Sequence, residues 1–453
     1  MNAERLIEIY DRVADAPDAV PHLRQFILDL AVRGKLVEQN PNDEPVTELL
    51  NRIDCEKGKL EKQIKTKKYP QDNIVEPKFN VPTTWEWVSL CQIGWIVGGG
   101  TPRTSEANNF AHPDSGIAWI TPTDLGKLTG LFIDRGDRDI TEKGLHDSSA
   151  RISPTGSILF SCRAPIGYVA ISSNPVSTNQ GIKTLVPYIS GLSQYVAYVL
   201  SHFAVDIDAS APGTTYRELS GKLFARVLIP LPPLAEQNRI VDKINDLIAL
   251  CDEIEASRNK RESIRAKLTV SSLGKLVDFK SSEEEFRNHA GFVIDNISSL
   301  TVNTEQIRQL RKTILQLATS GKLVEQNPNE EPASELLERI KAEKSRFQSH
   351  VVRKKKASSE SPVNKIPFSL PSSWTWVSIE TVFLYDAGIK RDPKTLDPYF
   401  WLLELQDIEK DTGRLIKKVM SKDRTSKSTK SEFRTGDILY GKLRPYLNKV
   451  LVA

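Results

Sequence analysis

The chain has 453 residues, enough for two to four domains, and its 39% hydrophobic and 26% charged content is normal for a globular protein. Its net charge of +4 is only mildly basic, which permits nucleic acid as a partner without requiring it. The four cysteines form no CxxC pair and the chain has no long apolar run, which argues against a zinc site, a disulfide framework and a membrane span. We therefore expect a protein of the reducing cytoplasm.

A duplicated helical segment comes first along the chain. Residues 34–45 read GKLVEQNPNDEP and residues 321–332 read GKLVEQNPNEEP, with eleven of twelve positions identical. Before each copy, apolar residues recur at helical spacing up to Gly34 or Gly321, where a helix C-cap is expected. After each copy, VTELLNRIDCEKGKL and ASELLERIKAEKSRF predict a second short helix.

A basic linker follows each helix pair, and then a segment with two tryptophans. VPTTWEWVSL (81–90) and LPSSWTWVSI (370–379) share a W-x-W-V-S core, and this alternation predicts the first strand of a new domain. Their tryptophans are expected in the core and rim of that domain. Further on, TGSILFSCRAPIGYVAI (155–171) resembles TGDILYGKLRPYLNKVLVA (435–453), so a unit of two helices, a linker and a β-rich domain occurs twice.

A helical stretch near 191–203 and then a long helix from about 233 to 270 are expected in the middle of the chain. The long helix begins at prolines, and its apolar residues alternate spacings of four and three, as in a heptad seam: Ile240, Ile244, Leu247, Cys251 and Ile254. About 37 residues would span roughly 55 Å, longer than one turn of B-DNA at about 34–36 Å. The periodicity equally fits an ordinary packing helix. A helical region at about 285–320 is predicted to be its antiparallel partner.

These patterns predict an α+β protein with a tandem pseudo-repeat, in which two mostly-β domains are separated by long helices forming an antiparallel coiled-coil spacer. The expected domains are a helical region 1–68, a β-rich domain 80–230, a helical spacer 231–347, a basic linker 348–364 and a second β-rich domain 365–453. The sequence ends at Ala453, so the second unit has no counterpart of the stretch that follows Ile171 in the first unit. We therefore expect a chain truncated at its C-terminus or completed by another chain.

No motif for catalysis is found in the sequence. GGGT at 98–101 lacks the Gly-Lys-Ser/Thr ending of a phosphate-binding loop and predicts a turn whose backbone closely approaches either DNA or neighbouring backbone. Asp134, Asp137 and Asp139 are interpreted as a charged turn between strands, not a metal site. There is no HExxH motif and no Asn/Asp-Pro-Pro-Tyr/Phe tetrad of a DNA methyltransferase. The sequence thus predicts no catalytic residue, no metal and no cofactor in this chain.

The chain resembles the specificity subunit of type I restriction–modification systems (HsdS). The features that carry the resemblance are IPLPPLAEQNRIV before the long helix, the alternation of domains and helices, and the motifs GGGTPRTSE, TGSILFSCRAPIG and STNQG. The resemblance implies a non-catalytic subunit whose two target-recognition domains each read half of a split sequence in double-stranded DNA. It further implies that the helices bind methylation (HsdM) subunits, that restriction (HsdR) subunits join, and that S-adenosylmethionine, ATP and Mg²⁺ act in those partners.

In DNA binding, Lys and Arg side chains contact the phosphates. Arg, Lys, Asn, Gln, Ser and Thr side chains form hydrogen bonds with base edges. We expect fewer than half of the candidates to contact DNA, since the others can be solvated charges or, as at Asn179–Gln180 and Thr214–Thr215, side chains that fix loops. The candidates are Thr101, Arg103, Ser161, Arg163, Asn179, Gln180, Lys183, Thr214, Thr215 and Arg217 in the first domain, and Lys390, Arg391, Lys442, Arg444 and Tyr446 in the second.

Three other functions remain open on this sequence. One is an enzyme in its own right, a methyltransferase or nuclease, which the missing motifs disfavour. The second is a protein–protein scaffold, in which the repeat is a bivalent docking platform. The third is a truncated, non-functional remnant of a specificity subunit, which would expose strand edges and aggregate.

Overall fold

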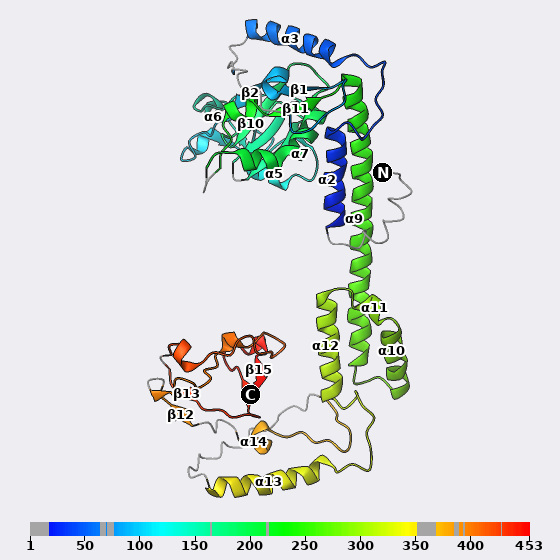
Figure 1. Cartoon of the computed structure of the whole chain (residues 1–453), viewed down its shortest axis with the longest axis vertical. Coiled ribbons are helices and arrows are strands. Elements are labelled where there is room, and N and C mark those ends of the chain that lie inside the picture. Colours follow the sequence, from blue (N-terminus) through cyan, green and yellow to red (C-terminus); the bar gives the residue numbers. More distant parts are fainter. Residues whose placement is uncertain are drawn as a thin grey trace. The chain divides into compact units, whose positions relative to one another are not determined.

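The structure is a computed structural model and describes residues 18–63, 69, 77–163, 165–213, 217–350, 368–384, 389–392, 395–426 and 428–453. It divides into two compact units, Met1–Ile264 and Arg265–Ala453, called unit 1 and unit 2 below. Figure 1 labels many of their helices and strands. No helix among the described residues is both long and apolar enough to cross a membrane. The mixture of sheets and long helices confirms the α+β class.

The described residues of unit 1 form three sheets. The largest is a five-stranded sheet of β2 (Gly94–Gly98), β10 (Ile182–Pro187), β7 (Ile158–Cys162), β8 (Ile166–Ser172) and β5 (Phe132–Ile133), in that spatial order. A four-stranded sheet follows the order β3 (Phe110–Ala111), β6 (Asp139–Ile140), β4 (Ile117–Ile120) and β9 (Ser177–Thr178). A third sheet pairs β1 (Glu86–Ser89) with β11 (Leu228–Leu231). The first strand predicted at WEWVS is therefore confirmed in unit 1.

Short helices connect the strands of unit 1, and long ones cover its core. The short ones are α4 (Leu90–Ile93), η1 (Ala107–Asn109), α5 (Pro122–Lys127), α6 (Glu142–His146) and α8 (Gly221–Ala225). The long ones are α2 (Ala19–Val32), α3 (Val46–Gln63), α7 (Ser193–Ser210) and α9 (Leu234–Leu276). Every residue of β7 is buried, and Phe160 of that strand stacks on Phe224 with ring centroids 5.1 Å apart.

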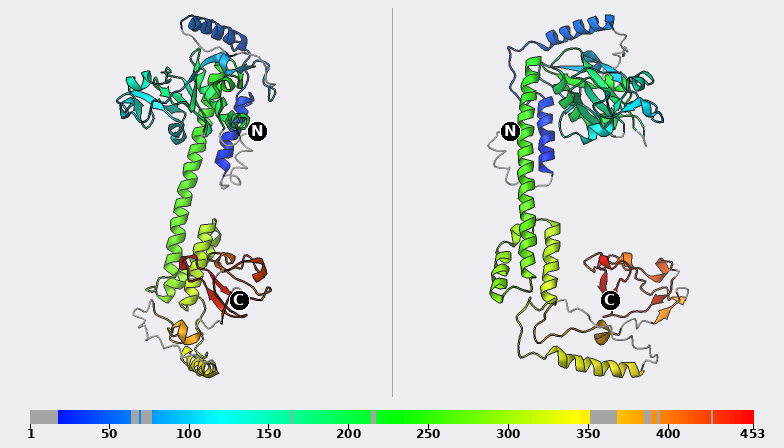
Figure 2. Two further views of the ribbon diagram at one scale, coloured as in Figure 1. Left: turned by 90° about the vertical axis from the view of Figure 1, so that its left-hand side faces the viewer. Right: turned by 180° about the vertical axis from the view of Figure 1, so that it is seen from behind.

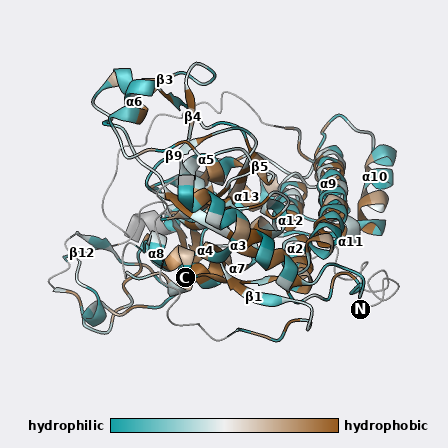
Figure 3. Cartoon of the chain, turned by 90° about the horizontal axis from the view of Figure 1, so that it is seen from above, coloured by the Kyte–Doolittle hydropathy of each residue, from teal (hydrophilic) through white to brown (hydrophobic). Residues whose placement is uncertain are grey.

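The predicted apolar seam of α9 packs into the core of unit 1. Ile240, Ile244 and Cys251 are buried there, and Leu247 and Ile254 pack against the same cluster. Figure 2 shows α2 alongside this part of α9, where Arg24 Nη2 lies 2.9 Å from Glu255 Oε2. The α9 ribbon carries both hydrophilic and hydrophobic positions (Figure 3), as expected of a helix with one apolar stripe. In unit 1, therefore, the seam serves as a packing face for α2 and for the core beneath the sheets.

Unit 2 begins with helices that pack on the end of α9. These helices are α10 (Glu283–Asp295), α11 (Ile297–Leu300) and α12 (Thr304–Thr319), and they share a small core with Leu273 and Leu276 of α9. The predicted helical region at about 285–320 is confirmed, and it is divided into these three helices. The helical conformation ends after α11, and α12 begins after Asn303. The Asn303 side chain accepts a hydrogen bond from Gln306 N and caps α12.

The rest of unit 2 consists of a long helix and short strands. They are α13 (Ala333–His350), α14 (Ile379–Val382), β12 (Lys390–Arg391) paired with β13 (Lys430–Ser431), and β14 (Ile438–Tyr440) paired with β15 (Val450–Val452), with 3-10 turns at Leu405–Asp407, Ser421–Asp423 and Pro445–Leu447. Asp407 accepts from Arg424 Nη2 at 2.7 Å, and this hydrogen bond is the main cause of its lowered pKa. The strand predicted at WTWVS does not form in unit 2: residues 374–378 make no sheet pairing there.

The duplicated segments 34–45 and 321–332 fold in the same way in both units. Gly34 (φ +66°) and Gly321 (φ +74°) end α2 and α12 in the left-handed conformation, and the next N–H donates to the carbonyl five residues back, at 2.9 and 3.0 Å. A Cβ at either glycine would lie 2.5 Å from the Cγ atom of a proline, Pro82 or Pro371. Both predicted C-caps are confirmed, and the repeat extends to the contacts between helix and domain.

Candidate nucleic-acid interface

A cavity of about 560 Å³ with several polar side chains in its lining lies in unit 1, where the loops of the two larger sheets meet. Four of the predicted residues line it: Thr101, Arg163, Asn179 and Gln180. The remaining lining residues are Trp119, Thr121, Pro122, Thr123, Asp124, Asp137 and Arg138. Residues separated by as many as 79 positions are thus brought to one site, as the hydrogen bond from Thr101 to Gln180 shows.

The glycines before Thr101 allow two loops to cross at this cavity. Gly100 N donates to Thr178 O at 2.8 Å, and Asn179 N donates to Ile120 O at 3.0 Å. A Cβ on Gly99 would lie only 1.8 Å from Asn179 O, and a Cβ on Gly100 would lie 2.2 Å from Ala150 N. The predicted close approach at GGGT is confirmed, and the approach is to neighbouring backbone.

The two amide side chains in the cavity have different roles. Asn179 Oδ1 accepts from Gly181 N at 2.9 Å, which fixes the STNQG turn by a bond from side chain to backbone. Gln180 Oε1 accepts from the Thr101 hydroxyl, which joins this turn to the loop after β2. The NH₂ group of Gln180 remains a potential donor to a ligand.

Arg138 and Arg163 give the cavity its positive charge. The Arg138 guanidinium lies over the Phe110 ring, 4.1 Å from its centroid, and 5.3 Å from that of Trp119. Trp119 is in turn held by its Nε1–H, which donates to Gly100 O at 3.0 Å. Within the described part of the chain, no carboxylate forms an ion pair with Arg138 or Arg163. Both guanidinium groups can therefore serve an anionic ligand.

The two acids of the cavity are used inside the protein. Asp124 is buried, caps α5 through Thr121 N at 2.8 Å, and accepts from Asp137 N at 2.9 Å. Asp137 itself pairs with Lys127. Residues 134–138 form a turn between β5 and β6, as predicted, whereas Asp139 is a buried residue of β6 that pairs with Arg135. Arg138 was not among the candidates predicted from the sequence, because only its tertiary contacts with Phe110 and Trp119 distinguish it from the charged residues beside it.

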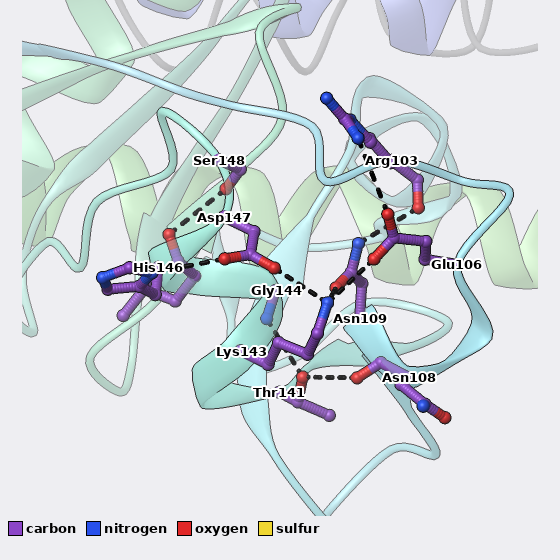
Figure 4. A network of polar contacts seen from close by, with 11 residues as sticks. Arg103, Glu106, Asn108, Asn109, Thr141, Lys143, Gly144, His146, Asp147 and Ser148 are labelled. Carbon is purple, nitrogen blue, oxygen red and sulfur yellow. Dashed lines mark hydrogen bonds and ion pairs between the residues drawn. The ribbon is translucent and has the colours of Figure 1, made fainter.

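Arg103 lies in a charged network outside the residues that line the cavity (Figure 4). Its Nη1 is 3.7 Å from Glu106 Oε1, and Lys143 Nζ donates to both Glu106 and Asp147 at 2.8 Å. The hydrogen bond from Lys143 lowers the pKa of Glu106, and bonds from Lys143 and His146 lower that of Asp147. The network holds η1 against α6, and Arg103 is partly neutralised there.

The other candidates of the first domain are less suited to a ligand. Ser161 is buried, and its hydroxyl donates to Pro165 O at 2.9 Å and accepts from Tyr168 N at 2.8 Å. Lys183 Nζ donates to Gln180 O at 3.3 Å, and Arg217 pairs with Asp208 at 3.2 Å. Thr214 and Thr215 lie outside the described residues. We therefore centre the interface on Thr101, Arg138, Arg163 and Gln180.

In unit 2 the candidates fall into two groups. Lys390 Nζ donates to Ser431 Oγ of the neighbouring strand β13 at 2.7 Å. Arg391 Nη2 lies 2.8 Å from Oε2 of Glu432, the residue after that strand. Both side chains are therefore engaged within unit 2. Lys442, Arg444 and Tyr446 are exposed in the turn between β14 and β15, and Arg444 has a left-handed backbone (φ +55°). This turn is the better candidate surface of unit 2.

The arrangement is suited to binding, because guanidinium, amide and hydroxyl groups are the donors that meet phosphates and base edges. Among the described residues, no group of three His, Cys, Asp or Glu is placed to hold a metal ion.

Comparison with known proteins agrees with this geometry. Residues 82–264, which contain the cavity, match the family model described as type I restriction modification DNA specificity domain. The chain is 32% identical over 391 residues to the EcoAI specificity subunit and over 389 residues to the EcoEI specificity subunit, both from Escherichia coli. Each alignment covers 82% of this chain and 63% of the relative, so the chain spans less than two thirds of these curated relatives.

Among solved structures, the HsdS subunit from Thermoanaerobacter tengcongensis is 20% identical, with a TM-score of 0.35, over 56% of this chain and 50% of that one. On the sequence matches, this chain is similar to the specificity subunits of type I restriction–modification systems, and residues 82–264 match a type I DNA specificity domain.

Proposed function

We propose that this chain is a non-catalytic DNA sequence-recognition subunit of a type I restriction–modification complex. The observation that carries the proposal is the cavity of unit 1, where two arginines without carboxylate partners among the described residues meet Thr101 and Gln180. An arginine can bind guanine O6 and N7 with two hydrogen bonds, and the Gln amide can bind adenine. The cavity would then read one half of a bipartite target in double-stranded DNA.

The partners are inferred from the similarity to specificity subunits and belong to the same proposal. The duplicated helix pairs, α2 with α3 and α12 with α13, would bind methylation (HsdM) subunits, because two nearly identical segments offer two nearly identical surfaces. Restriction (HsdR) subunits would join this core in the cytoplasm, and S-adenosylmethionine, ATP and Mg²⁺ would act in the partners. Lys442, Arg444 and Tyr446 of unit 2 would contribute to the second half of the target.

The length of α9 supports a role in target spacing. The helix has 43 residues, which at 1.5 Å per residue corresponds to about 64 Å, nearly two turns of B-DNA at about 34–36 Å each.

Replacing Arg163 tests the reading function of the cavity. We expect Arg163→Ala to weaken binding to the preferred duplex by about 1–3 kcal/mol and to relax the preference at one base position. The measurement is selection from a random duplex library, followed by titration of the selected sequence. Arg52→Ala is the matched control, because Arg52 is an exposed arginine on α3 that pairs with Glu44 at 2.8 Å.

The outcomes of this test separate three roles for Arg163. Loss of preference at one position identifies a base-reading residue. Uniform weakening across all sequences, with a smaller dependence on salt, identifies a phosphate contact. Binding equal to that of Arg52→Ala removes Arg163 from the interface. A wild-type chain that selects no sequence at all would overturn the proposed function itself.

A further inference from the structure

Two aromatic rings hold Arg138 in the lining of the cavity of unit 1. Its guanidinium carbon lies 4.1 Å from the centroid of the Phe110 ring and 5.3 Å from that of Trp119. The two rings meet edge to face, with their centroids 5.7 Å apart. Trp119 is only 3% exposed, and its Nε1–H donates to Gly100 O at 3.0 Å. The support under Arg138 is therefore anchored in the core.

The pairing of β4 with β6 explains why Arg138 meets these rings. In this antiparallel register, Ala118 is the partner of Asp139. The next pair along the two chains is Trp119 with Arg138. Side chains two residues apart share one face of a strand, so Arg138 lies on the face of Ile140. Ile140 belongs to the same apolar cluster as Trp119, so the backbone register itself brings Arg138 to the aromatic side of this sheet.

The N–H donors of Arg138 remain available to a ligand. Contact with a ring face uses the charge of the guanidinium but no hydrogen-bond acceptor. Among the residues that the structure describes, none accepts a hydrogen bond from the Arg138 side chain. Arg135, three residues earlier in the same turn, instead pairs with Asp114 at 2.7 Å and with buried Asp139 at 2.5 Å. The turn thus contains one arginine that stabilises the fold and one that is positioned but unused.

We propose that Arg138 is a specificity-determining residue that reads a guanine, and that Phe110 and Trp119 are the positioning residues that hold its guanidinium. Guanine presents two acceptors in the major groove, O6 and N7, and the planar guanidinium can donate to both. An arginine that is already held by rings loses less conformational freedom on binding than a free one, so more of the hydrogen-bond energy is kept as discrimination. This inference rests on the proposed function, because it requires that the cavity faces DNA.

Replacing Arg138 tests the assigned base. The full-length chain selects duplexes from a random library, and the selected duplex is then titrated beside variants that differ from it at single base pairs. We expect the wild-type chain to require guanine at one position, and Arg138→Ala to lower that discrimination about five- to 150-fold while the other positions keep their preference. Arg138 is exposed, so its replacement leaves the fold intact. Arg52→Ala, an exposed arginine on α3, is again the matched control.

Replacing Phe110 tests the positioning role. Phe110→Leu keeps an apolar side chain in the cluster but removes the ring under Arg138, so it should lower discrimination at the same guanine about two- to fivefold. Combined with Arg138→Ala, it should have no further effect at that position, which a general loss of stability would not reproduce. Phe132→Leu is the control, because Phe132 is 48% exposed on β5 and does not line the cavity.

The outcomes separate this inference from the function on which it rests. A wild-type chain that selects no sequence overturns both. A wild-type chain whose selected sequence is unchanged by Arg138→Ala overturns only this inference. Equal weakening of all duplexes, with a smaller dependence on salt, makes Arg138 a phosphate contact, and relaxation at a base other than guanine contradicts the assigned base. Additive effects of Phe110→Leu and Arg138→Ala would show that the rings do not position the arginine.

Discussion

Replacing Gly99 by alanine is expected to reduce specific DNA binding by more than tenfold, about 1.4 kcal/mol or more. The added Cβ would lie 1.8 Å from Asn179 O and 2.4 Å from Asn179 C. Both are backbone atoms, so no side-chain rotation relieves the overlap. The loop after β2 must separate from the STNQG turn, and the contact between Thr101 and Gln180 in the cavity is lost with it.

The neighbouring glycine provides a matched control for this substitution. A Cβ on Gly98 meets no atom within 4 Å, so Gly98→Ala should bind the selected duplex like the wild-type chain. Anisotropy titrations with that duplex measure the effect, and thermal unfolding shows whether the variant is folded. Equal affinities for Gly98→Ala and Gly99→Ala would show that the crossing of these loops does not organise the interface.

Removal of the Glu236 carboxylate is expected to lower the free energy of unfolding by about 2–4 kcal/mol, because it leaves two donors without an acceptor. These donors are Trp85 Nε1 and Gln39 Nε2. They link the start of the β-rich domain and the duplicated segment 34–45 to the first turn of α9. Burial raises the pKa of Glu236, and the two hydrogen bonds act in the opposite direction. The network therefore stabilises the junction from which α9 starts.

Denaturant unfolding of Glu236→Ala, followed by tryptophan fluorescence, measures this contribution. Glu253→Ala is the control, because Glu253 is exposed on the same helix and its loss should change stability by less than about 0.5 kcal/mol. If the two variants unfold at the same denaturant concentration, the buried network contributes nothing measurable, and the position of α9 depends on apolar packing alone.

Local features of this fold could be predicted from the sequence, because their causes are local. Gly34 and Gly321 end helices as expected, since the left-handed backbone of a helix C-cap favours glycine. The W-x-W-V-S strand shows the limit of such reasoning. The same pattern forms β1 in unit 1 and pairs with no described strand in unit 2, because a strand requires a partner, and β11, the partner of β1, is distant from it in sequence.

For the candidate interface, too, the types of residue could be predicted from the sequence, whereas their arrangement could not. Arginine, threonine and glutamine could be selected from the chemistry of DNA recognition, and Thr101, Arg163 and Gln180 do line one cavity. The sequence could not show that Arg138 joins them, since the aromatic rings that hold it come from β3 and β4. Nor could it show that the Ser161 hydroxyl is used within the hairpin of β7 and β8.

The most direct test of the central claim is a methylation map of DNA in cells that express this chain together with a type I methylation subunit. The account predicts modified adenines in one defined, split sequence, only when this chain is present, and an altered sequence with Arg163→Ala. Modification at the same sequence without the chain, modification without sequence preference, or no modification despite a folded chain would contradict it.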